Sequence, residues 1–332
     1  MAQPRYQVLG VGNALVDVIA QVDDVFLEQH GLARGTMTLI DADRARVLYD
    51  AMPPSVERSG GSCGNTMAAL ASLGGTGAYV GKVSADQLGE VFRHDIRAAG
   101  IAYDVPPAAN SSTGRCLIMV TSDAQRTMQT YLGAANDLTG DDIDPLLVAD
   151  AQVTFLEGYL WDPPGAKEAF LKAATSAHAG GRKVSLTLSD PFCVERFRDE
   201  FVDLVQNHID ILFANEDEIT SLYLVDRFED AVERVRGRCE IAALTRSERG
   251  SVIVTADETH EIAAERIGDV VDTTGAGDAY AAGVLYGITS GRDLATSGRI
   301  ASIAAGEVIS HFGPRPERSL AALVRERIGE SA

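Results

Sequence analysis

Short apolar runs alternate with amphipathic segments along most of this chain, and this alternation constrains the fold more than any other feature. Apolar strands that alternate with helices are typical of a parallel sheet covered on both faces. We therefore predict an α/β domain built on a mostly parallel sheet flanked by helices. The predicted strands are residues 6–11, 78–83, 153–156, 184–188, 211–214, 241–244 and 251–255. The predicted helices are residues 65–73, 88–99, 165–179, 195–207, 216–225 and 228–237, and the chain turns helical from residue 277 onward.

Two regions break the alternation. Residues 16–22 and 36–40 have strand patterns, and residues 116–121 and 127–132 predict a hairpin around a turn at 122–125. We predict a small β subdomain built from two insertions, about residues 14–42 and 110–134, within a single domain of residues 1–332. A lid over a site and an extension of the main sheet both remain open at this point.

Composition limits the partners. The formal net charge is -19 over 332 residues, so nucleic acid and anionic membranes are not expected as partners. The four cysteines are far apart in the sequence, which favours a reduced compartment over a disulfide or zinc framework. The first residues lack the pattern of a signal peptide, and no run has the length of a membrane span. We expect a cytoplasmic protein that binds small molecules.

A glycine pair follows the first predicted strand in LGVGNALVDV, residues 9–18. A dinucleotide-binding turn would need a third glycine where Leu15 stands and a helix after it, so we reject that interpretation. Asn13 and Asp17 lie near the carboxyl end of the strand, where open α/β sheets bind ligands. They suit hydroxyl recognition, although a turn asparagine and a solvated aspartate would explain them equally simply.

A second glycine-rich stretch, SGGSCGNTM, covers residues 59–67. Gly60 and Gly61 permit a close approach of the backbone to a ligand, and the Asn65 amide can donate and accept hydrogen bonds. A glycine turn before a capped helix is the alternative explanation. Cys63 has no histidine nearby in the sequence, so we expect a packed side chain rather than a nucleophile.

The third glycine site is DTTGAGD, residues 272–278, between a strand predicted over residues 262–271 and a helix. The N–H groups of Gly275, Ala276 and Gly277 would converge at the helix N-terminus, where the helix dipole favours an anion. They could stabilise a phosphoryl group during its transfer. Asp278 could then take the proton from the attacking hydroxyl. A simple acidic helix start would not explain the glycines.

These three stretches, DTTGAGDAY, SGGSCGNT and GNALVD, resemble the PfkB carbohydrate kinase family, also called the ribokinase family, over essentially the whole chain. The resemblance implies a doubly wound, ribokinase-like sheet with a small β-sheet lid. It also implies transfer of the γ-phosphoryl group of ATP to a primary hydroxyl of a sugar or nucleoside. Asp278 matches the catalytic base of the family and residues 275–277 match its anion hole. The positions that grip sugar hydroxyls in the family are matched by Asn13, Asp17, Gly60, Gly61 and Asn65.

The resemblance also implies the ATP and metal sites. Asn215 and Glu218 match the N-x-x-E element that places magnesium, usually through water, beside the phosphates, and oxygen ligands suit this ion. Thr245 and Gly250 match the loop over the nucleotide, although residues 246–249 are more charged than usual. In the family, backbone oxygens near two residues matched here by Asp272 and Thr274 form a monovalent-cation site. Activation by potassium therefore stays open.

The second glycine stretch bears on the choice of the phosphoryl acceptor. The stretch G-G-S-x-x-N is closer to the adenosine kinase branch, in which an arginine placed like Arg126 reaches the phosphates when the lid closes. A base could pack on apolar side chains of the lid, which could equally be its core. The candidates are Leu15, Met37, Leu39 and Tyr131. The leading hypothesis is a nucleoside kinase that converts adenosine to AMP. The alternatives are a kinase for a free ribose, fructose or keto-deoxy sugar, and an inactive ligand sensor. Monomer and homodimer both remain open.

Overall fold

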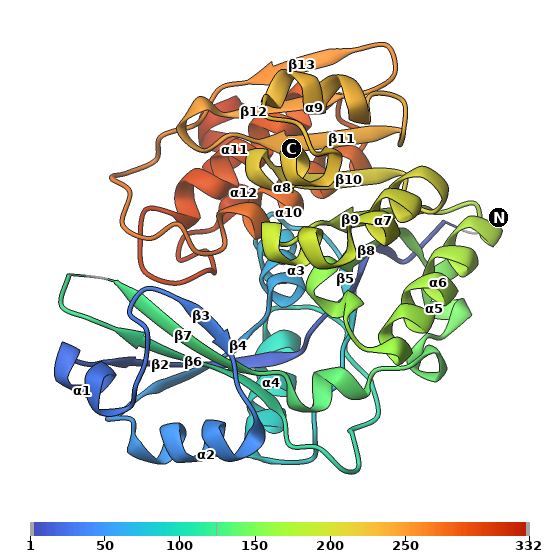
Figure 1. Cartoon of the computed structure of the whole chain (residues 1–332). Helices are drawn as coiled ribbons and strands as arrows, with labels where there is room; N and C mark the ends of the chain where they lie inside the picture. The colour runs from blue at the N-terminus through green and yellow to red at the C-terminus, as the bar shows by residue number, and fades with distance from the viewer. Residues whose placement is uncertain (1–2, 124, 330–332) are drawn as a thin grey trace.

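A large sheet forms the centre of the computed structural model, and a smaller sheet lies below it in Figure 1. The structure describes residues 3–123 and 125–329. The large sheet has eight strands in the order β13-β12-β11-β10-β9-β8-β1-β5. All neighbours from β11 to β5 are parallel, and β12 and β13 are antiparallel additions at one edge. This confirms the predicted mostly parallel α/β fold.

The parallel strands of the large sheet are mostly buried, because helices cover both of its faces, whereas the edge strand at residues 259–262 is largely exposed. Each predicted strand of this sheet is present within a few residues of its expected position. Their bounds are β1 Tyr6–Val11, β5 Gly77–Val80, β8 Ala151–Glu157, β9 Lys183–Thr187, β10 Ile211–Asn215, β11 Ile241–Thr245, β12 Ser251–Val254 and β13 Thr259–Ile262.

The second sheet has the strand order β3-β7-β6-β2-β4. Its strands are β2 Leu15–Gln21, β3 Met37–Leu39, β4 Val56–Gly60, β6 Gly114–Val120 and β7 Arg126–Tyr131. The predicted strands of the small subdomain are therefore present, but β4 lies beyond the interval 14–42 and was not predicted. Its sequence, VERSG, carries little apolar character. The turn predicted at 122–125 includes residue 124, which lies outside the described residues.

Helices fill the spaces around the two sheets (Figure 1). The six predicted helices are present, and the chain beyond residue 277 is helical as expected. Helices α1 and α5, with 6 and 5 residues, and the longer helix α2 were not predicted. The bounds are α1 Asp24–Gln29, α2 Ala42–Ala51, α3 Ser62–Ser72, α4 Gln87–Ala98, α5 Pro145–Ala149, α6 Pro164–Ala179, α7 Pro191–Asn207, α8 Glu216–Tyr223, α9 Phe228–Val235, α10 Ala276–Thr289, α11 Leu294–Val308 and α12 Leu320–Ile328.

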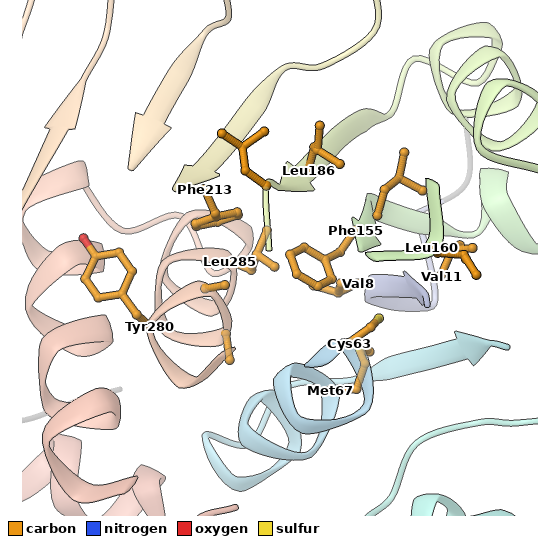
Figure 2. Close-up of a cluster of buried hydrophobic side chains, with 14 of the residues drawn as sticks. Val8, Val11, Cys63, Met67, Phe155, Leu160, Leu186, Phe213, Tyr280 and Leu285 are labelled. Atoms are coloured by element: carbon orange, nitrogen blue, oxygen red, sulfur yellow. The ribbon is translucent and has the colours of Figure 1, made fainter. Parts of the chain in front are cut away.

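A buried apolar layer joins the large sheet to α3 and α10 (Figure 2). Phe155 of β8 and Phe213 of β10 meet edge to face, with ring centroids 6.1 Å apart. A Cβ on Gly10 would approach the Cys63 Sγ to 2.7 Å, and one on Gly283 would approach the Ala301 Cα to 2.3 Å. These glycines let α3 lie close to β1 and α10 close to α11. The layer therefore fixes the two helices whose N-termini carry the second and third glycine stretches.

The strand predicted over residues 262–271 is wrong. Strand β13 ends at Ile262, and a loop leads from there to α10. Val270 and Val271 are exposed by 60% and 41%, and the Val271 N–H donates to the Ile309 carbonyl at the end of α11. The apolar character of this stretch thus reflects a loop that crosses a helix end rather than a buried strand.

Candidate active site

Helix α10 begins at the third glycine stretch, beside the small sheet. Gly275 has φ +80°, and a Cβ there would lie 2.6 Å from the Pro314 carbonyl oxygen, so this position requires glycine. Gly277 has no atom within 4 Å of the place where its Cβ would stand. The Ala276 N–H donates to the Thr273 carbonyl. The Gly275 and Gly277 N–H groups have no hydrogen-bond acceptor among the described residues. Free N–H groups at a helix N-terminus are a suitable site for an anion.

Asp278 lies in the first turn of α10 and is held by two donors from α3. The Ser62 hydroxyl donates to Oδ1 at 2.6 Å, and the Asn65 amide Nδ2 donates to Oδ2 at 3.2 Å. Desolvation raises the Asp278 pKa from 3.8 to about 6, against the lowering effect of both hydrogen bonds. The carboxylate is therefore fixed in orientation, ionised at neutral pH, and basic enough to accept a proton.

Asn13 follows β1 and is bound to a carboxylate that the sequence analysis missed. Its Nδ2 donates to the Glu157 Oε1 at 2.8 Å, and its backbone N–H lies 3.3 Å from Oε2. The Cys63 N–H also donates to Oε2, at 2.9 Å. Glu157 is 1% exposed, and burial raises its pKa to about 7. Glu157 ends the apolar strand β8 at the carboxyl edge of the sheet, which was a usable signal in the sequence.

Asp17 lies on β2 and is 8% exposed. Burial raises its pKa to about 6, although the nearby guanidinium of Arg315 acts to lower it. Arg315 comes from the loop before α12, and its Nε lies 3.4 Å from the Asn65 Oδ1. Its Nη2 is buried without a partner in the described part of the chain. Arg315 was also missed, because nothing in its local sequence, GPRPE, indicates a site.

The structure brings Gly60 and Gly61 into this region, and both have internal reasons to be glycine. A Cβ on Gly60 would lie 2.4 Å from the Asp17 carboxylate. Gly61 has φ +83°, and its Cβ would lie 2.2 Å from the Asn13 carbonyl oxygen. The pair therefore lets β4 and the start of α3 pack directly against Asp17 and Asn13.

Arg126 connects the small sheet to the loop before α10. It forms an ion pair with Asp272, and its Nη1 lies 3.3 Å from the Thr274 Oγ1. The Asp272 carboxylate also accepts from the Thr274 N–H and hydroxyl and from the Gly313 N–H at 2.8 Å. Asp272 thus joins three separate segments around the glycine loop, and its carboxylate is fully engaged by protein donors.

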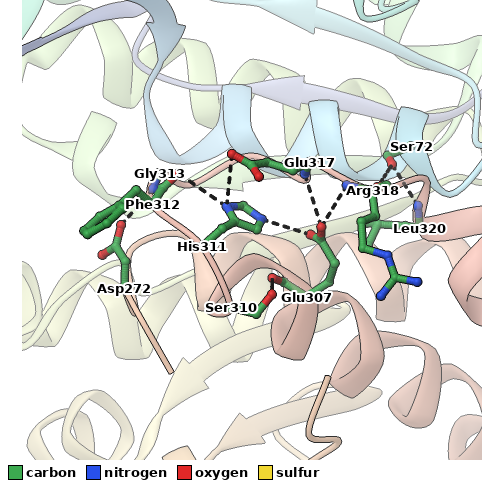
Figure 3. A network of polar contacts seen from close by, with 10 residues as sticks. All are labelled: Ser72, Asp272, Glu307, Ser310, His311, Phe312, Gly313, Glu317, Arg318 and Leu320. Carbon is green, nitrogen blue, oxygen red and sulfur yellow. Dashed lines mark hydrogen bonds and ion pairs between the residues drawn. The ribbon is translucent and has the colours of Figure 1, made fainter. Parts of the chain in front are cut away.

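A buried carboxylate organises the loop that supplies Gly313 and Arg315 (Figure 3). Glu307 of α11 is 0% exposed. Its Oε1 accepts from the Glu317 and Arg318 N–H groups at 3.2 and 2.8 Å, and its Oε2 contacts the His311 ring. The polar network therefore holds this loop against the N-terminal end of α10.

The predicted nucleotide residues lie together at the carboxyl edge of β10 and β11, where Asn215 pairs with Thr245. Asn215 and Glu218 form a capping box, with the Asn215 Nδ2 2.7 Å from the Glu218 Oε1. Burial raises the Glu218 pKa to about 7. Gly250 has φ +82° and packs against the Ile262 carbonyl.

The charged residues between Thr245 and Gly250 are anchored. Arg246 and Arg249 both pair with Glu216, in the first turn of α8. The Arg246 guanidinium also stacks on the Phe228 ring, 4.2 Å from its centroid. The unusual charge of this loop therefore serves to hold it beside Asn215.

Strand register divides the apolar candidates of the small sheet. Asp17 pairs with Cys116, Cys116 with Thr130, and Thr130 with Leu39. Paired residues share a face, so Leu39, and Met37 two residues before it, face the same side as Asp17. Leu39 and Met37 are exposed by 47% and 42% and are therefore not core residues.

Leu15 shares the Asp17 face as well, but it is buried. Tyr131 has the opposite parity and lies on the other face, where the Arg115 guanidinium stands 6.0 Å from its ring centroid and 5.2 Å from that of Tyr49. Tyr131 is thus separated from the other candidates by the sheet itself.

Within residues 3–123 and 125–329, no group of three or more His, Cys, Asp or Glu side chains is arranged to hold a metal ion. In the same residues, no helix has the length and apolar character needed to cross a membrane.

The chain is similar in sequence and in fold to known kinases. The family model for "pfkB family carbohydrate kinase" matches residues 38–319. A probable sugar kinase from Rhizobium etli CFN 42 is 51% identical, with a TM-score of 0.91 over 98% of this chain and 99% of that one. The adenosine kinase from Sinorhizobium meliloti is also 51% identical, with a TM-score of 0.90 over 97% and 99%. Adenosine kinase from Saccharomyces cerevisiae is 28% identical over 327 residues, 92% of this chain and 95% of that protein.

Proposed function

Because the chain belongs to the pfkB family of carbohydrate kinases and is thus an ATP-dependent kinase with an alcohol group as acceptor, we propose that its acceptor is a nucleoside, most simply adenosine. The reaction transfers the γ-phosphoryl group of ATP to the primary 5′-hydroxyl and yields AMP. One observation carries the choice of acceptor: the exposed Met37 and Leu39 share a face of the small sheet with the buried Asp17. A ribose on the carboxylate would leave its base beside apolar side chains.

The phosphoryl group lies, in this proposal, at the N-terminus of α10. The free N–H groups of Gly275 and Gly277 stabilise the charge that spreads over its oxygens during transfer, while the Ala276 N–H, expected to share this role, donates to the Thr273 carbonyl. The absence of any neighbour around the Gly277 Cβ position supports this, since nothing in the described part of the protein requires glycine there. A methyl group would occupy the space that the phosphoryl oxygens need.

Asp278 accepts the proton of the attacking hydroxyl. Its two hydrogen bonds, from Ser62 and Asn65, aim the carboxylate before the substrate arrives. A pKa of about 6 leaves it ionised at pH 7 and better matched to proton transfer than an ordinary aspartate.

The acceptor hydroxyls are bound by residues around β2 and the start of α3. Asn13 and Asp17 offer buried oxygens to these hydroxyls. Gly60 and Gly61 let the backbone come close to the acceptor, and Asn65 lies between this region and Asp278. We assign the base to the side of Leu15, Met37 and Leu39. Tyr131 is left out of the base site, because it lies on the other face of the sheet.

The nucleotide is bound at the carboxyl edge of β10 and β11, by Asn215, Thr245 and Gly250. Magnesium use is general in this family, and the donor chemistry fits: Asn215 and Glu218 offer an amide and a carboxylate, oxygen ligands that suit the ion. As the family resemblance implies, Glu218 would hold magnesium through water. Bound magnesium would neutralise charge on the transferring phosphoryl group.

Arg126 supports the glycine loop through Asp272 and would reach the phosphates when the small sheet, residues 15–60 and 114–131, closes on the site. A potassium site formed by backbone oxygens near Asp272 and Thr274 stays a prediction, while the Asp272 carboxylate itself is engaged by protein donors. Turnover in potassium against sodium chloride tests it.

The test of the acceptor is a coupled phosphorylation screen with magnesium and ATP over adenosine, inosine, guanosine, cytidine, ribose, fructose and 2-keto-3-deoxygluconate. We expect adenosine to give the highest kcat/KM. Preference for a free sugar would refute the nucleoside assignment and favour a sugar kinase, the name given to the Rhizobium etli relative. Binding without turnover of any acceptor would favour a ligand sensor.

A further inference from the structure

The orientation of the Asn13 side chain is set by Glu157. The Asn13 Nδ2 lies 2.8 Å from the Glu157 Oε1, and the two residues are 2% and 1% exposed. In its ionised state, which predominates above its raised pKa of about 7, the Glu157 carboxylate only accepts hydrogen bonds, so it selects the amide orientation in which the NH2 group faces it. The reverse orientation would place two acceptor oxygens against each other in a buried site.

The Asn13 Oδ1 is consequently left without a protein donor. It is buried and has no hydrogen-bond partner among the described residues. Buried polar atoms are normally paired, so an oxygen of this kind beside a binding region indicates a group supplied from outside. No hydrogen-bond donor to the Asp17 carboxylate is found in the described chain either. The Asn13 Oδ1 and the Asp17 carboxylate are thus acceptors without a hydrogen-bond donor, although the unpaired Arg315 Nη2 belongs to the guanidinium near Asp17, so a ligand group that meets the Asn13 Oδ1 must bring a donor.

We propose that Glu157 is a positioning residue that sets acceptor specificity: it holds Asn13 so that only its oxygen faces the substrate, which must therefore offer an O–H or N–H at that point. A hydroxyl satisfies this requirement, whereas fluorine or a carbonyl oxygen does not. The inference rests on the proposed assignment of Asn13 to the acceptor site. It concerns hydroxyl recognition, so it applies to a nucleoside and to a free sugar alike.

Glu157→Gln should invert the orientation. The Gln oxygen can still accept from the Asn13 and Cys63 N–H groups that contact Oε2. The Gln Nε2 then takes the place of Oε1 and needs an acceptor, which the Asn13 Oδ1, unpaired among the described residues, can provide. The amide turns over and presents its NH2 group to the substrate. The shape and volume of the side chain stay nearly the same.

The readout is the ratio of kcat/KM between adenosine and two analogues, 2′-deoxy-2′-fluoroadenosine and 3′-deoxy-3′-fluoroadenosine. In the wild type, the analogue whose fluorine meets Asn13 should be about 10- to 100-fold poorer, because it leaves a buried oxygen unpaired. In Glu157→Gln this ratio should approach one. The other fluorine position, which meets Asp17, should keep its discrimination and thereby serves as an internal control.

A double variant separates positioning from general disturbance. In Glu157→Gln with Asn13→Asp, one oxygen of the introduced aspartate accepts from the Gln Nε2 and the other again faces the substrate, so discrimination against fluorine should return. Asn13→Asp alone opposes two carboxylates and should lower kcat/KM for every acceptor. Asp86→Asn is the matched structural control, since Asp86 caps α4 and binds Thr113 away from this region. It should lower the melting temperature and leave the ratio unchanged.

An equal loss of kcat/KM for adenosine and both analogues in Glu157→Gln, without recovery in the double variant, would overturn the proposal. If the wild type phosphorylates ribose or fructose and not adenosine, the nucleoside assignment fails while the inference stays testable. The same variants are then measured with that sugar and its deoxyfluoro derivatives, and the same ratios decide.

Discussion

Replacing Asp278 by asparagine should slow the enzyme and stabilise it, and both effects follow from the same desolvated carboxylate. The introduced asparagine would keep the size of the side chain but could not take the proton of the acceptor hydroxyl. General-base groups contribute about 10²- to 10⁴-fold to rate, so we expect kcat to fall by about 10³-fold. Acceptor and ATP affinities, measured by calorimetry, should change little.

The stability gain can be worked out from the pKa. Burial raises the Asp278 pKa from 3.8 to about 6, so at about 1.36 kcal/mol for each pKa unit, ionisation costs the folded state about 3 kcal/mol at pH 8. This cost is absent below pH 3.8, the pKa in the unfolded state, and is complete above about pH 6, the pKa in the folded state. Near pH 5, about half of the cost is therefore present. The asparagine variant avoids the cost. It loses about 1 kcal/mol, because its oxygen can still accept from Asn65 and its NH2 group can donate to the Ser62 hydroxyl, but the two hydrogen bonds are no longer made to a charged group.

The net gain at pH 8 is thus about 2 kcal/mol. With an unfolding entropy of about 2.1 cal/mol/K for each of the 332 residues, the melting temperature should rise by about 3 °C at pH 8 and by about 1 °C at pH 5. Scanning calorimetry of both proteins at the two pH values measures this. A difference in melting temperature that does not depend on pH would refute the raised pKa of Asp278. An unchanged kcat in the asparagine variant would refute the assignment of Asp278 as the base. The wild-type kcat should also fall as the pH drops below about 6.

Three further predictions concern the surrounding residues. Gly277→Ala should lower turnover without loss of stability, because only a ligand needs that space, whereas Gly275→Ala should lower the melting temperature as well; equal thermal behaviour of the two would contradict the phosphoryl site. Arg126→Met leaves Asp272 buried without its cation, so urea unfolding should show a loss of about 3 kcal/mol, and an unchanged midpoint would argue against a structural ion pair. Arg315→Met removes the positive charge that lowers the Asp17 pKa, so this pKa should rise in the variant. As the pH is lowered, the KM for the acceptor should therefore begin to increase at a higher pH than in the wild type, and identical profiles of KM against pH would exclude this role.

The sequence predicted the large sheet well because its strands are continuous apolar runs. It predicted the glycine stretches around Asp278 because they carry a specific local pattern. Glu157 offered one signal, its place at the end of an apolar strand, and Arg315 offered none. Each acts through a contact with a distant segment, Glu157 with Asn13 and Arg315 with Asn65, and such pairings depend on the complete fold.

Strand register set a second limit. Leu39 and Tyr131 both looked suitable for packing on a base, and their local sequences do not distinguish them. Only the pairing from Asp17 through Cys116 and Thr130 shows that Leu39 shares a face with the carboxylate and that Tyr131 does not. A shift of one residue would have exchanged the two side chains. The sequence indicated two alternating faces but not which of them faces the site.

The glycines of the site show how structure separates two reasons for one residue type. Gly60, Gly61 and Gly275 are each explained by an atom of the protein that a Cβ would strike. Gly277 has no such neighbour among the described residues and begins a helix, where alanine would be about 1 kcal/mol more favourable. Glycine at that position therefore makes the protein without its ligand less stable. A ligand that approaches the backbone would explain why the residue is nevertheless glycine. Of the four, Gly277 is the one whose identity points to the reaction rather than to the fold.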